Sequence, residues 1–165
     1  MGSQTGAVTL KPAFTIEPEP VDGPEVERAL ESYVAELNER FPDGFDASRA
    51  APPAPADFVP PAGVFLVVRV EERVLGCGAV RTEADGVGEI RRMWISPTLR
   101  GHGAGRALLR ELEAHARRLG CDRIRLDTAA ELHEARALYV SEGYAEIPAY
   151  NDNQYAKHWF EKALR

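Results

Sequence analysis

The sequence predicts a mixed α/β (α+β) domain in which a central, mostly antiparallel sheet is flanked by helices. A length of 165 residues, with 44% hydrophobic and 28% charged residues, suits one folded core. Three β-branched runs separated by short turns favour an antiparallel meander. A helix then joins the third run to a further strand, and such a crossover normally places the two strands parallel. The sheet is therefore predicted to be mixed.

The amino-terminal segment predicts a leader, a strand and a helix. Residues 1–13 are expected to be a flexible leader, and residues 14–165 a single domain that starts with a strand in FTIEPEP. Asp22 is a candidate helix cap and Pro24 a first-turn residue. The helix that follows has one apolar stripe at helical spacing, formed by Val26, Leu30, Tyr33, Val34, Leu37 and Phe41.

A long segment rich in proline, alanine and aspartate follows the helix. Residues 41–61 therefore predict no regular structure. Because the segment contains Phe41, Phe45 and Phe58, we expect a loop that packs on the domain. A linker between two domains is the alternative, but the roughly forty ordered residues before it are marginal for a core of their own.

The middle of the chain predicts three antiparallel strands, a helix and a parallel strand. GVFLVVRV and VLGCGAVRT are separated by EER, which indicates a hairpin, and EIRRMWIS follows the turn EADGVG. A helix comes next and ends at Gly120, and its apolar face contains Ala107, Leu108, Leu112, Ala116 and Leu119. The strand RIRLDT is then expected to lie parallel to EIRRMWIS.

The carboxyl-terminal part predicts a short helix and a closing pair of strands. The helix, around HEARALYVSE, ends at Gly143. YAEIP and AKHWFEKAL are expected to pair around the loop AYNDNQY. The predicted order of elements is β-α-β-β-β-α-β-α-β-β.

Charge and cysteine content argue against several classes of function. A formal net charge of −6 disfavours general binding to nucleic acid or to an anionic membrane surface. Cys77, Cys121 and the four histidines show no ligand spacing, so neither a metal site nor a disulfide framework is predicted. Without a long apolar run or a signal peptide pattern, a cytoplasmic location is expected. The sequence leaves the oligomeric state open, a homodimer included.

A glycine-rich loop stands where the third strand of the meander gives way to a helix. In RGHGAGRALL, Arg100, Gly103 and Gly105 fit the pattern R-x-x-G-x-G. Glycine lets the backbone come close to a ligand, and the loop amides together with the positive end of the helix suit a diphosphate. Arg100, His102 and Arg106 add donors.

The alternative for this loop is a helix start that merely needs close packing. The dinucleotide fingerprint does not apply, because it needs a parallel unit at the start of the domain. The Walker loop does not apply either, because its Lys-Ser/Thr pair is missing. Both nucleotide-binding interpretations are therefore set aside, and an anion site suited to a diphosphate remains beside the close-packing alternative.

These segments resemble those of a known family. EIRRMWISPTLRGHGAGRALL looks like the central strand, diphosphate loop and helix of the GNAT acetyltransferases, and ARALYVSEGY resembles the family's A-x-x-x-Y-x-x-x-G-[FY] segment. The resemblance runs from about Val64 to Tyr144 and implies the GNAT fold and acetyl-CoA (coenzyme A) as cofactor. This chain departs from the family at Leu132, where an asparagine often contacts the cofactor. The resemblance also implies that the amino-terminal helix and the long loop form the acceptor side.

The resemblance assigns candidate cofactor-binding residues. In the family, backbone amides of the central strand hold the acetyl and pantetheine portions, which implies the same role for Met93, Trp94 and Ile95. The diphosphate would then be bound by the loop and the first helical turn, which comprise Arg100, Gly101, His102, Gly103, Ala104, Gly105 and Arg106.

Two residues are candidates for catalysis by the same resemblance. Glu89 lies where the histone acetyltransferase branch of the family has its general base, and a salt bridge to Arg91 or Arg92 is the alternative. Tyr139 lies where family members have the phenol that protonates the thiolate of coenzyme A, and a core tyrosine is the alternative. Cys77 has no partnered base in the sequence pattern, which favours direct transfer over an acetyl-cysteine.

Alternation along the third strand of the meander is predicted to divide its side chains between two faces. With a period of two, the sets are Glu89, Arg91, Met93 and Ile95 on one face and Ile90, Arg92 and Trp94 on the other. Charged residues in a central strand indicate a wet cleft or local ion pairs.

The predicted function is that of an N-acetyltransferase, a transferase of the acyltransferase class. It would move an acetyl group directly from acetyl-CoA to a primary amine of a small molecule in a ternary complex. Acetylation of a protein or peptide amine is one alternative, and a non-catalytic acyl-CoA-binding regulatory module is another. The acceptor itself is not predicted, because such pockets are built from loops without a sequence code.

Overall fold

Three α-helices and seven strands form the part of the chain that the computed structural model describes, residues 13–47 and 54–164. The helices are α1 (Pro24–Arg40), α2 (Ala104–Arg118) and α3 (His133–Ser141). The strands are β1 (Thr15–Pro18), β2 (Gly63–Val70), β3 (Arg73–Thr82), β4 (Val87–Ile95), β5 (Arg123–Thr128), β6 (Ala145–Ile147) and β7 (His158–Ala163). The predicted leader lies outside the described residues except for its last residue, Ala13.

The strands form one sheet in the order β1-β2-β3-β4-β5-β7-β6. Each neighbouring pair is antiparallel except β4 and β5, which are parallel. This sheet, with helices on both faces, confirms the predicted fold class and the predicted order of elements. The closing pair inserts its second strand, β7, between β5 and β6.

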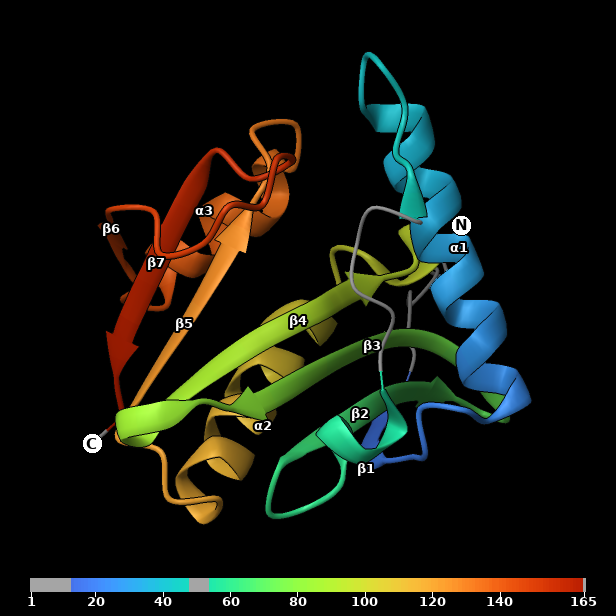
Figure 1. Cartoon of the computed structure of the whole chain (residues 1–165). Helices are drawn as coiled ribbons and strands as arrows, with labels where there is room; N and C mark the ends of the chain where they lie inside the picture. The colour runs from blue at the N-terminus through green and yellow to red at the C-terminus, as the bar shows by residue number, and fades with distance from the viewer. Residues whose placement is uncertain (1–12, 48–53, 165) are drawn as a thin grey trace, which may run out of the picture.

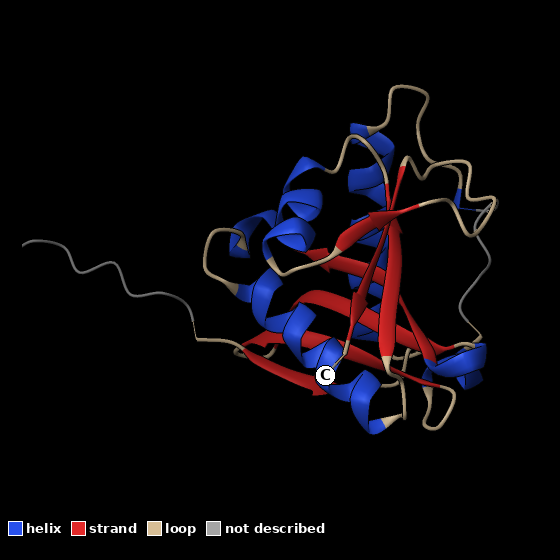
Figure 2. Ribbon diagram, turned by 90° about the vertical axis from the view of Figure 1, so that its left-hand side faces the viewer, coloured by secondary structure: helices blue, strands red, loops and turns tan. Residues whose placement is uncertain are grey.

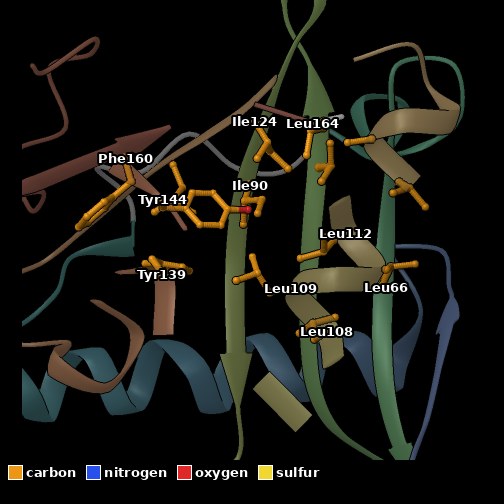
Figure 3. Close-up of a cluster of buried hydrophobic side chains, with 14 of the residues drawn as sticks. Leu66, Ile90, Leu108, Leu109, Leu112, Ile124, Tyr139, Tyr144, Phe160 and Leu164 are labelled. Carbon is orange, nitrogen blue, oxygen red and sulfur yellow. The ribbon is translucent and has the colours of Figure 1, made fainter. Parts of the chain in front are cut away.

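Two layers of helix cover the sheet (Figures 1 and 2). On one face, the leucines of α2 pack with residues of β2 and β4, and Tyr139 of α3 joins the same core (Figure 3). On the other face, Val26 and Ala29 of α1 pack with Phe65 of β2 and Cys77 of β3. Leu30 and Tyr33 of the apolar stripe read from the sequence pack against the same cluster, whereas Leu37 and Phe41 belong to a separate cluster with Ala129.

The proline-rich segment after α1 packs on the domain, as predicted from its aromatic residues. Phe41 and Phe58 are buried, and Phe58 belongs to a short 3-10 turn, Pro55–Phe58. Residues 48–53 of this segment lie outside the described residues. The cap of α1 differs from the prediction, because Gly23 and not Asp22 occupies the cap position.

A β-bulge in β4 makes the predicted alternation of this strand wrong. Gly78 of β3 faces both Arg92 and Met93 of β4, and Arg92 has a φ of 54°. The extra residue reverses the alternation along the rest of the strand. Ile90 therefore shares the α2 face with Met93 and Ile95, whereas Trp94 packs on the α1 face.

The helices within residues 13–47 and 54–164 are all too short or too polar to cross a membrane.

Candidate active site

Strands β4 and β5 start together and then separate. Their parallel pairing covers Val87, Gly88 and Glu89 of β4, and it stops there. Figure 1 shows the two strands diverging from this common start, with α1 on one side of the gap and α3 on the other. From Ile90 onward, the edge of β4 that faces β5 is therefore not paired with it, and two cavities adjoin this part of β4.

The first cavity, the cofactor-side cavity, has a volume of about 340 Å³. It is bounded by the carboxyl-terminal end of β4, the glycine-rich loop, the start of α2 and one face of α3. Most of the residues predicted to bind the cofactor line it, namely Met93, Trp94, Ile95, Arg100, Gly101, Gly103, Ala104, Gly105 and Arg106. His102 is absent from the lining of either cavity in the described structure.

The glycine-rich loop has two glycines in the left-handed region and ends at a helix start that no described side chain caps. Gly101 and Gly103 have φ values of 83° and 81°, which favour glycine, and a Cβ atom there would meet no protein atom within 4 Å. Gly103 caps α2, and among the described residues no side chain caps the amides of its first turn. Those amides and the positive end of the 15-residue helix therefore face the cavity lined by Ala104 and Gly105.

The arginines of this loop are engaged with acidic residues. The Arg100 guanidinium Nη2 donates to both carboxylate oxygens of Glu36 of α1 at 2.7 Å, and its Nε donates to the Ile95 carbonyl at 3.0 Å. Arg106 Nη1 donates to Glu142 Oε1 at 2.6 Å. Both side chains are at least one third exposed, so an incoming anion can compete for their donors.

The second cavity, the acceptor-side cavity, has a volume of about 500 Å³. It lies between the diverging strands, the end of α1 and the loop that connects β6 to β7. Glu89 lines this cavity, is 8% exposed, and forms an ion pair with Arg91 Nε. The salt bridge that the sequence left open is therefore present, and it stands within the cavity rather than at a distant rim.

A polar network fixes the β6–β7 loop on the end of β5. Asp127 Oδ2 accepts a hydrogen bond of 2.7 Å from Asn151 Nδ2, and Asp127 Oδ1 accepts one of 3.1 Å from Asn153 Nδ2. Asn151 Oδ1 in turn accepts a bond of 3.0 Å from Trp159 Nε1. The sequence analysis missed this network, although the cluster of asparagine and aspartate in AYNDNQY could have indicated a side-chain-bonded loop.

The two cavities meet at a small group of shared residues. Tyr33, Met93, Leu132, Ala135 and Tyr139 line both of them. Two of these five, Met93 and Tyr139, were named as site residues from the sequence. Tyr33 was assigned to the apolar stripe of α1, and Leu132 was noted as a departure from the family pattern.

Tyr139 is a buried phenol at this junction. It is 5% exposed, and its hydroxyl donates to Met93 Sδ at 3.9 Å, a weak bond. Burial raises the pKa of Tyr139 above its ordinary value. The phenol is therefore protonated throughout the neutral and mildly alkaline range.

The buried cysteine of β3 is unsuited to be a nucleophile. Cys77 is 0% exposed, and burial raises the pKa of its thiol to about 12. Nucleophilic attack needs the thiolate, which such a group does not form near neutral pH. Among residues 13–47 and 54–164, no group of three or more His, Cys, Asp or Glu side chains is arranged to hold a metal ion.

Comparison with curated proteins finds several acetyltransferases. An IAA acetyltransferase of Azospirillum brasilense is 40% identical over 83 residues, which cover 50% of this chain and 54% of that protein. An aminoglycoside N(6')-acetyltransferase type 1 of Stenotrophomonas maltophilia is 31% identical over 91 residues, which cover 50% of this chain and 60% of that protein. The chain spans about half the length of the curated relatives it matches.

Comparison with solved structures finds the same fold over most of the chain. A candidate acyl-CoA N-acyltransferase from Klebsiella pneumoniae is 28% identical with a TM-score of 0.76, over 92% of this chain and 98% of that one. An N-acetylglutamate synthase from Neisseria gonorrhoeae, complexed with coenzyme A and N-acetyl-glutamate, has a TM-score of 0.68 at 17% identity, over 93% of this chain and 35% of that one. This second likeness concerns the fold alone.

A family model described as "Acetyltransferase (GNAT) family" matches residues 27–144. The match contains β4 and α3, which line both cavities, and the glycine-rich loop, which lines the cofactor-side cavity. It confirms the family resemblance read from the sequence motifs. This chain belongs to the GNAT acetyltransferase family.

Proposed function

We propose that this chain is an N-acetyltransferase that moves an acetyl group from acetyl-CoA to a primary amine of a small molecule, directly and in a ternary complex. The observation that carries the proposal is the meeting of two cavities at Met93 and Tyr139. One cavity ends at the glycine-rich loop and the start of α2, and the other ends at a polar and aromatic wall. Two substrates entering from opposite sides would meet at this junction.

The residues of the cofactor-side cavity fit a coenzyme diphosphate. Gly101 and Gly103 leave the space in front of the backbone clear of side chains, and the uncapped first turn of α2 supplies amide donors. Arg100, released from Glu36, would add a charge-assisted bond. When bound, acetyl-CoA supplies an acetyl group activated as a thioester.

The central strand would hold the acyl end of the cofactor. Pairing of β4 with β5 stops after Glu89, so the β5-facing edge of Met93, Trp94 and Ile95 is available to a ligand. Backbone donors fixed in this way stabilise negative charge that develops on a carbonyl oxygen. The bulge at Arg92 sets the orientation of this edge, because it shifts the phase of the strand by one residue.

The acceptor-side residues would prepare the amine. Attack requires the neutral amine, and the guanidinium groups of Arg91 and Arg92 line the cavity, where positive charge lowers the pKa of a nearby ammonium. Glu89 would accept the proton that the amine loses, directly or through a water molecule. Its ion pair with Arg91 keeps it oriented within the cavity.

Tyr139 would protonate the departing thiolate. Its hydroxyl lies at the junction of the cavities and is protonated well above neutral pH, because burial raises its pKa. The hydrogen bond to Met93 Sδ is weak, so little is lost when the hydroxyl turns to a better acceptor. A buried Cys77 supports direct transfer rather than an acetyl-cysteine route.

Thermal unfolding with different ligands, combined with an amine panel, tests the proposal. Acetyl-CoA is expected to raise Tm, whereas NAD and ATP are not, because the loop lacks both nucleotide fingerprints. Release of free coenzyme A in the presence of a small primary amine is expected as well. Stabilisation by ATP alone, or release of coenzyme A only with peptide or protein amines, would contradict the proposal.

A further inference from the structure

We propose that the acceptor is an arylalkylamine, a primary amine joined by a short chain to an aromatic ring. This inference rests on the proposed function and names the substrate class of the acceptor-side cavity. It is carried by an aromatic wall, by the arrangement of charges, and by the position of both relative to Tyr139.

The aromatic wall consists of Phe41, Phe45 and Tyr155, which all line the acceptor-side cavity. Phe41 and Tyr155 are stacked, with ring centroids 5.5 Å apart and an interplanar angle of 23°. Phe45 lies 4.8 Å from Tyr155 and 5.9 Å from Phe41, tilted against the first and edge-on to the second. Phe41 is buried against the other two, and the half-buried Phe45 and Tyr155 offer ring surface that prefers another aromatic ring over a flexible alkyl chain.

Hydrogen bonds hold the wall in place. The Tyr155 hydroxyl accepts a bond of 3.0 Å from the Asp46 amide, and the Tyr155 amide donates to Asn153 Oδ1 at 3.1 Å. The Phe45 amide donates to Asn38 Oδ1 at 3.1 Å. One of these bonds holds the Tyr155 hydroxyl and two hold the backbone of Tyr155 and Phe45, so less ordering is needed when a ligand ring packs on the wall, and less binding energy is lost to that ordering.

The charges of the cavity disfavour an acceptor with several positive charges. Three carboxylates line the cavity, and two of them are engaged, Glu89 by Arg91 and Asp127 by the amide groups of Asn151 and Asn153. Arg91 and Arg92 add positive charge. The third carboxylate, Asp152, is not engaged by any of the described residues and can pair with one ammonium group. A polyamine or an aminoglycoside would bring more ammonium groups than this one carboxylate can pair, and the others would lie near Arg91 and Arg92, where like charges repel.

The wall and the reacting end are at different positions in the cavity. Phe41, Phe45 and Tyr155 line the acceptor-side cavity but not the cofactor-side cavity, whereas Met93 and Tyr139 line both. A ring on the wall would therefore leave its chain directed toward the junction. A single amine at the end of that chain would reach the site of transfer.

The test compares amines that differ in one property. Tryptamine and phenethylamine are assayed against n-hexylamine, spermidine and kanamycin, by release of coenzyme A from acetyl-CoA. We expect kcat/KM for the two aromatic amines to exceed that of the others by about tenfold or more. Binding of the same amines can also be measured with coenzyme A present, which carries no acetyl group to transfer. The affinities for the amines are expected to follow the same order.

Variants locate the effect at the wall. Phe45→Leu keeps apolar volume but removes the ring, and it is expected to raise KM for tryptamine about fivefold while leaving KM for n-hexylamine nearly unchanged. Tyr155→Leu should likewise raise KM for tryptamine more than KM for n-hexylamine. Phe58→Leu is the matched control, because Phe58 is a buried ring outside both cavities that packs against Phe65.

The outcomes separate this inference from the proposed function. Equal or faster acetylation of n-hexylamine, spermidine or kanamycin would overturn the arylalkylamine class and leave the acetyltransferase intact. Equal KM changes for tryptamine and n-hexylamine in Phe45→Leu would also overturn it. Absence of coenzyme A release with every amine, together with no stabilisation by acetyl-CoA, would instead overturn the proposed function.

Discussion

The hydroxyl of Tyr139 is a buried polar group with a weak partner. Its bond to Met93 Sδ is 3.9 Å long, whereas the hydroxyl of the neighbouring Tyr144 donates to Glu113 Oε2 at 2.8 Å. The two rings lie 5.8 Å apart in the same core. One phenol is thus bound to a charged acceptor, and the other is available for chemistry at the junction of the cavities.

We expect Tyr139→Phe to lower single-turnover acetylation about a hundredfold, because general acid catalysis typically contributes that much. The affinity for acetyl-CoA and the free energy of unfolding should change little, since the ring remains and the lost bond is weak. Rapid-quench kinetics and calorimetric titration measure the two effects separately.

Tyr144→Phe is the matched control for this prediction. It removes a hydroxyl from the adjacent ring and leaves the buried Glu113 with one partner fewer, so it should lower stability by about 1–3 kcal/mol. The rate of acetyl transfer by Tyr144→Phe should remain at the parent value. If Tyr139→Phe matched the parent rate in a single turnover, Tyr139 would be a packing residue.

Glu89→Gln tests the proposed base. The rate is expected to fall at neutral pH and to recover in part at higher pH, where more of the amine is already neutral. The pH dependence of kcat/KM for the amine measures this. Glu83→Gln is a suitable control, because Glu83 also pairs with an arginine, Arg81, but does not line the acceptor-side cavity. If Glu89→Gln kept the rate and the pH profile of the parent protein, Glu89 would have only the structural role of its ion pair with Arg91.

At the level of elements, the glycine-rich loop requires glycine for its conformation, and we propose that its ligand requires glycine as well. Gly103→Ala places a side chain at a φ of 81°, which costs about 1 kcal/mol of stability. The added methyl group meets no protein atom within 4 Å, so any further loss concerns the ligand. We expect the Kd for acetyl-CoA to rise at least about tenfold.

Gly120→Ala is the control that separates backbone strain at a positive φ from obstruction of the ligand by the added methyl group. Gly120 follows α2, has a φ of 89°, and likewise leaves a Cβ atom without a neighbour within 4 Å. It does not line the cofactor-side cavity. Comparable stability losses in both variants, with weaker cofactor binding in Gly103→Ala alone, are the expected pattern. If Gly103→Ala and Gly120→Ala bound acetyl-CoA with equal affinity, the loop would not be part of the binding site.

Local patterns in the sequence predict most elements but not the geometry of the site. The predicted strands at residues 63–70 and 123–128 have the observed bounds, because β-branched runs and flanking turns are local signals. The bulge has no such signal, because a non-glycine residue, Arg92, adopts its positive φ. The Asp127–Asn151 contact joins residues 24 positions apart and depends on where the β6–β7 loop folds.

At the scale of the whole molecule, buried acidic groups limit stability at high pH. Burial raises the pKa of Cys77 from 9.0 to about 12 and that of Tyr33 from 10.0 to about 12, and it also raises the pKa of Tyr139. Above pH 9, the unfolded chain therefore releases protons that the folded chain keeps, and stability falls as pH rises. Each such group adds about 1.4 kcal/mol per pH unit to the decline.

Urea unfolding between about pH 8 and 11 measures this decline. The free energy of unfolding should be nearly constant up to about pH 9 and then fall with increasing slope. Cys77→Ala and Tyr33→Phe should each make the fall shallower, because each variant removes one titrating group. A free energy of unfolding that stays constant up to pH 11 would show that these groups ionise normally in the folded state.

The short pairing of β4 with β5 also has a mechanical consequence. Three residue pairs connect the strands, so the sheet has two plates, β1 to β4 and β5 to β7, whose backbones pair with each other only over this short stretch. The core beneath the sheet also joins the two plates. In it, Leu108, Leu109 and Leu112 of α2 pack with Ile90 of one plate and Ile124 of the other (Figure 3). We therefore expect the aliphatic packing beneath the sheet, together with the short β4–β5 ladder, to hold the width of the gap in which both substrates would bind.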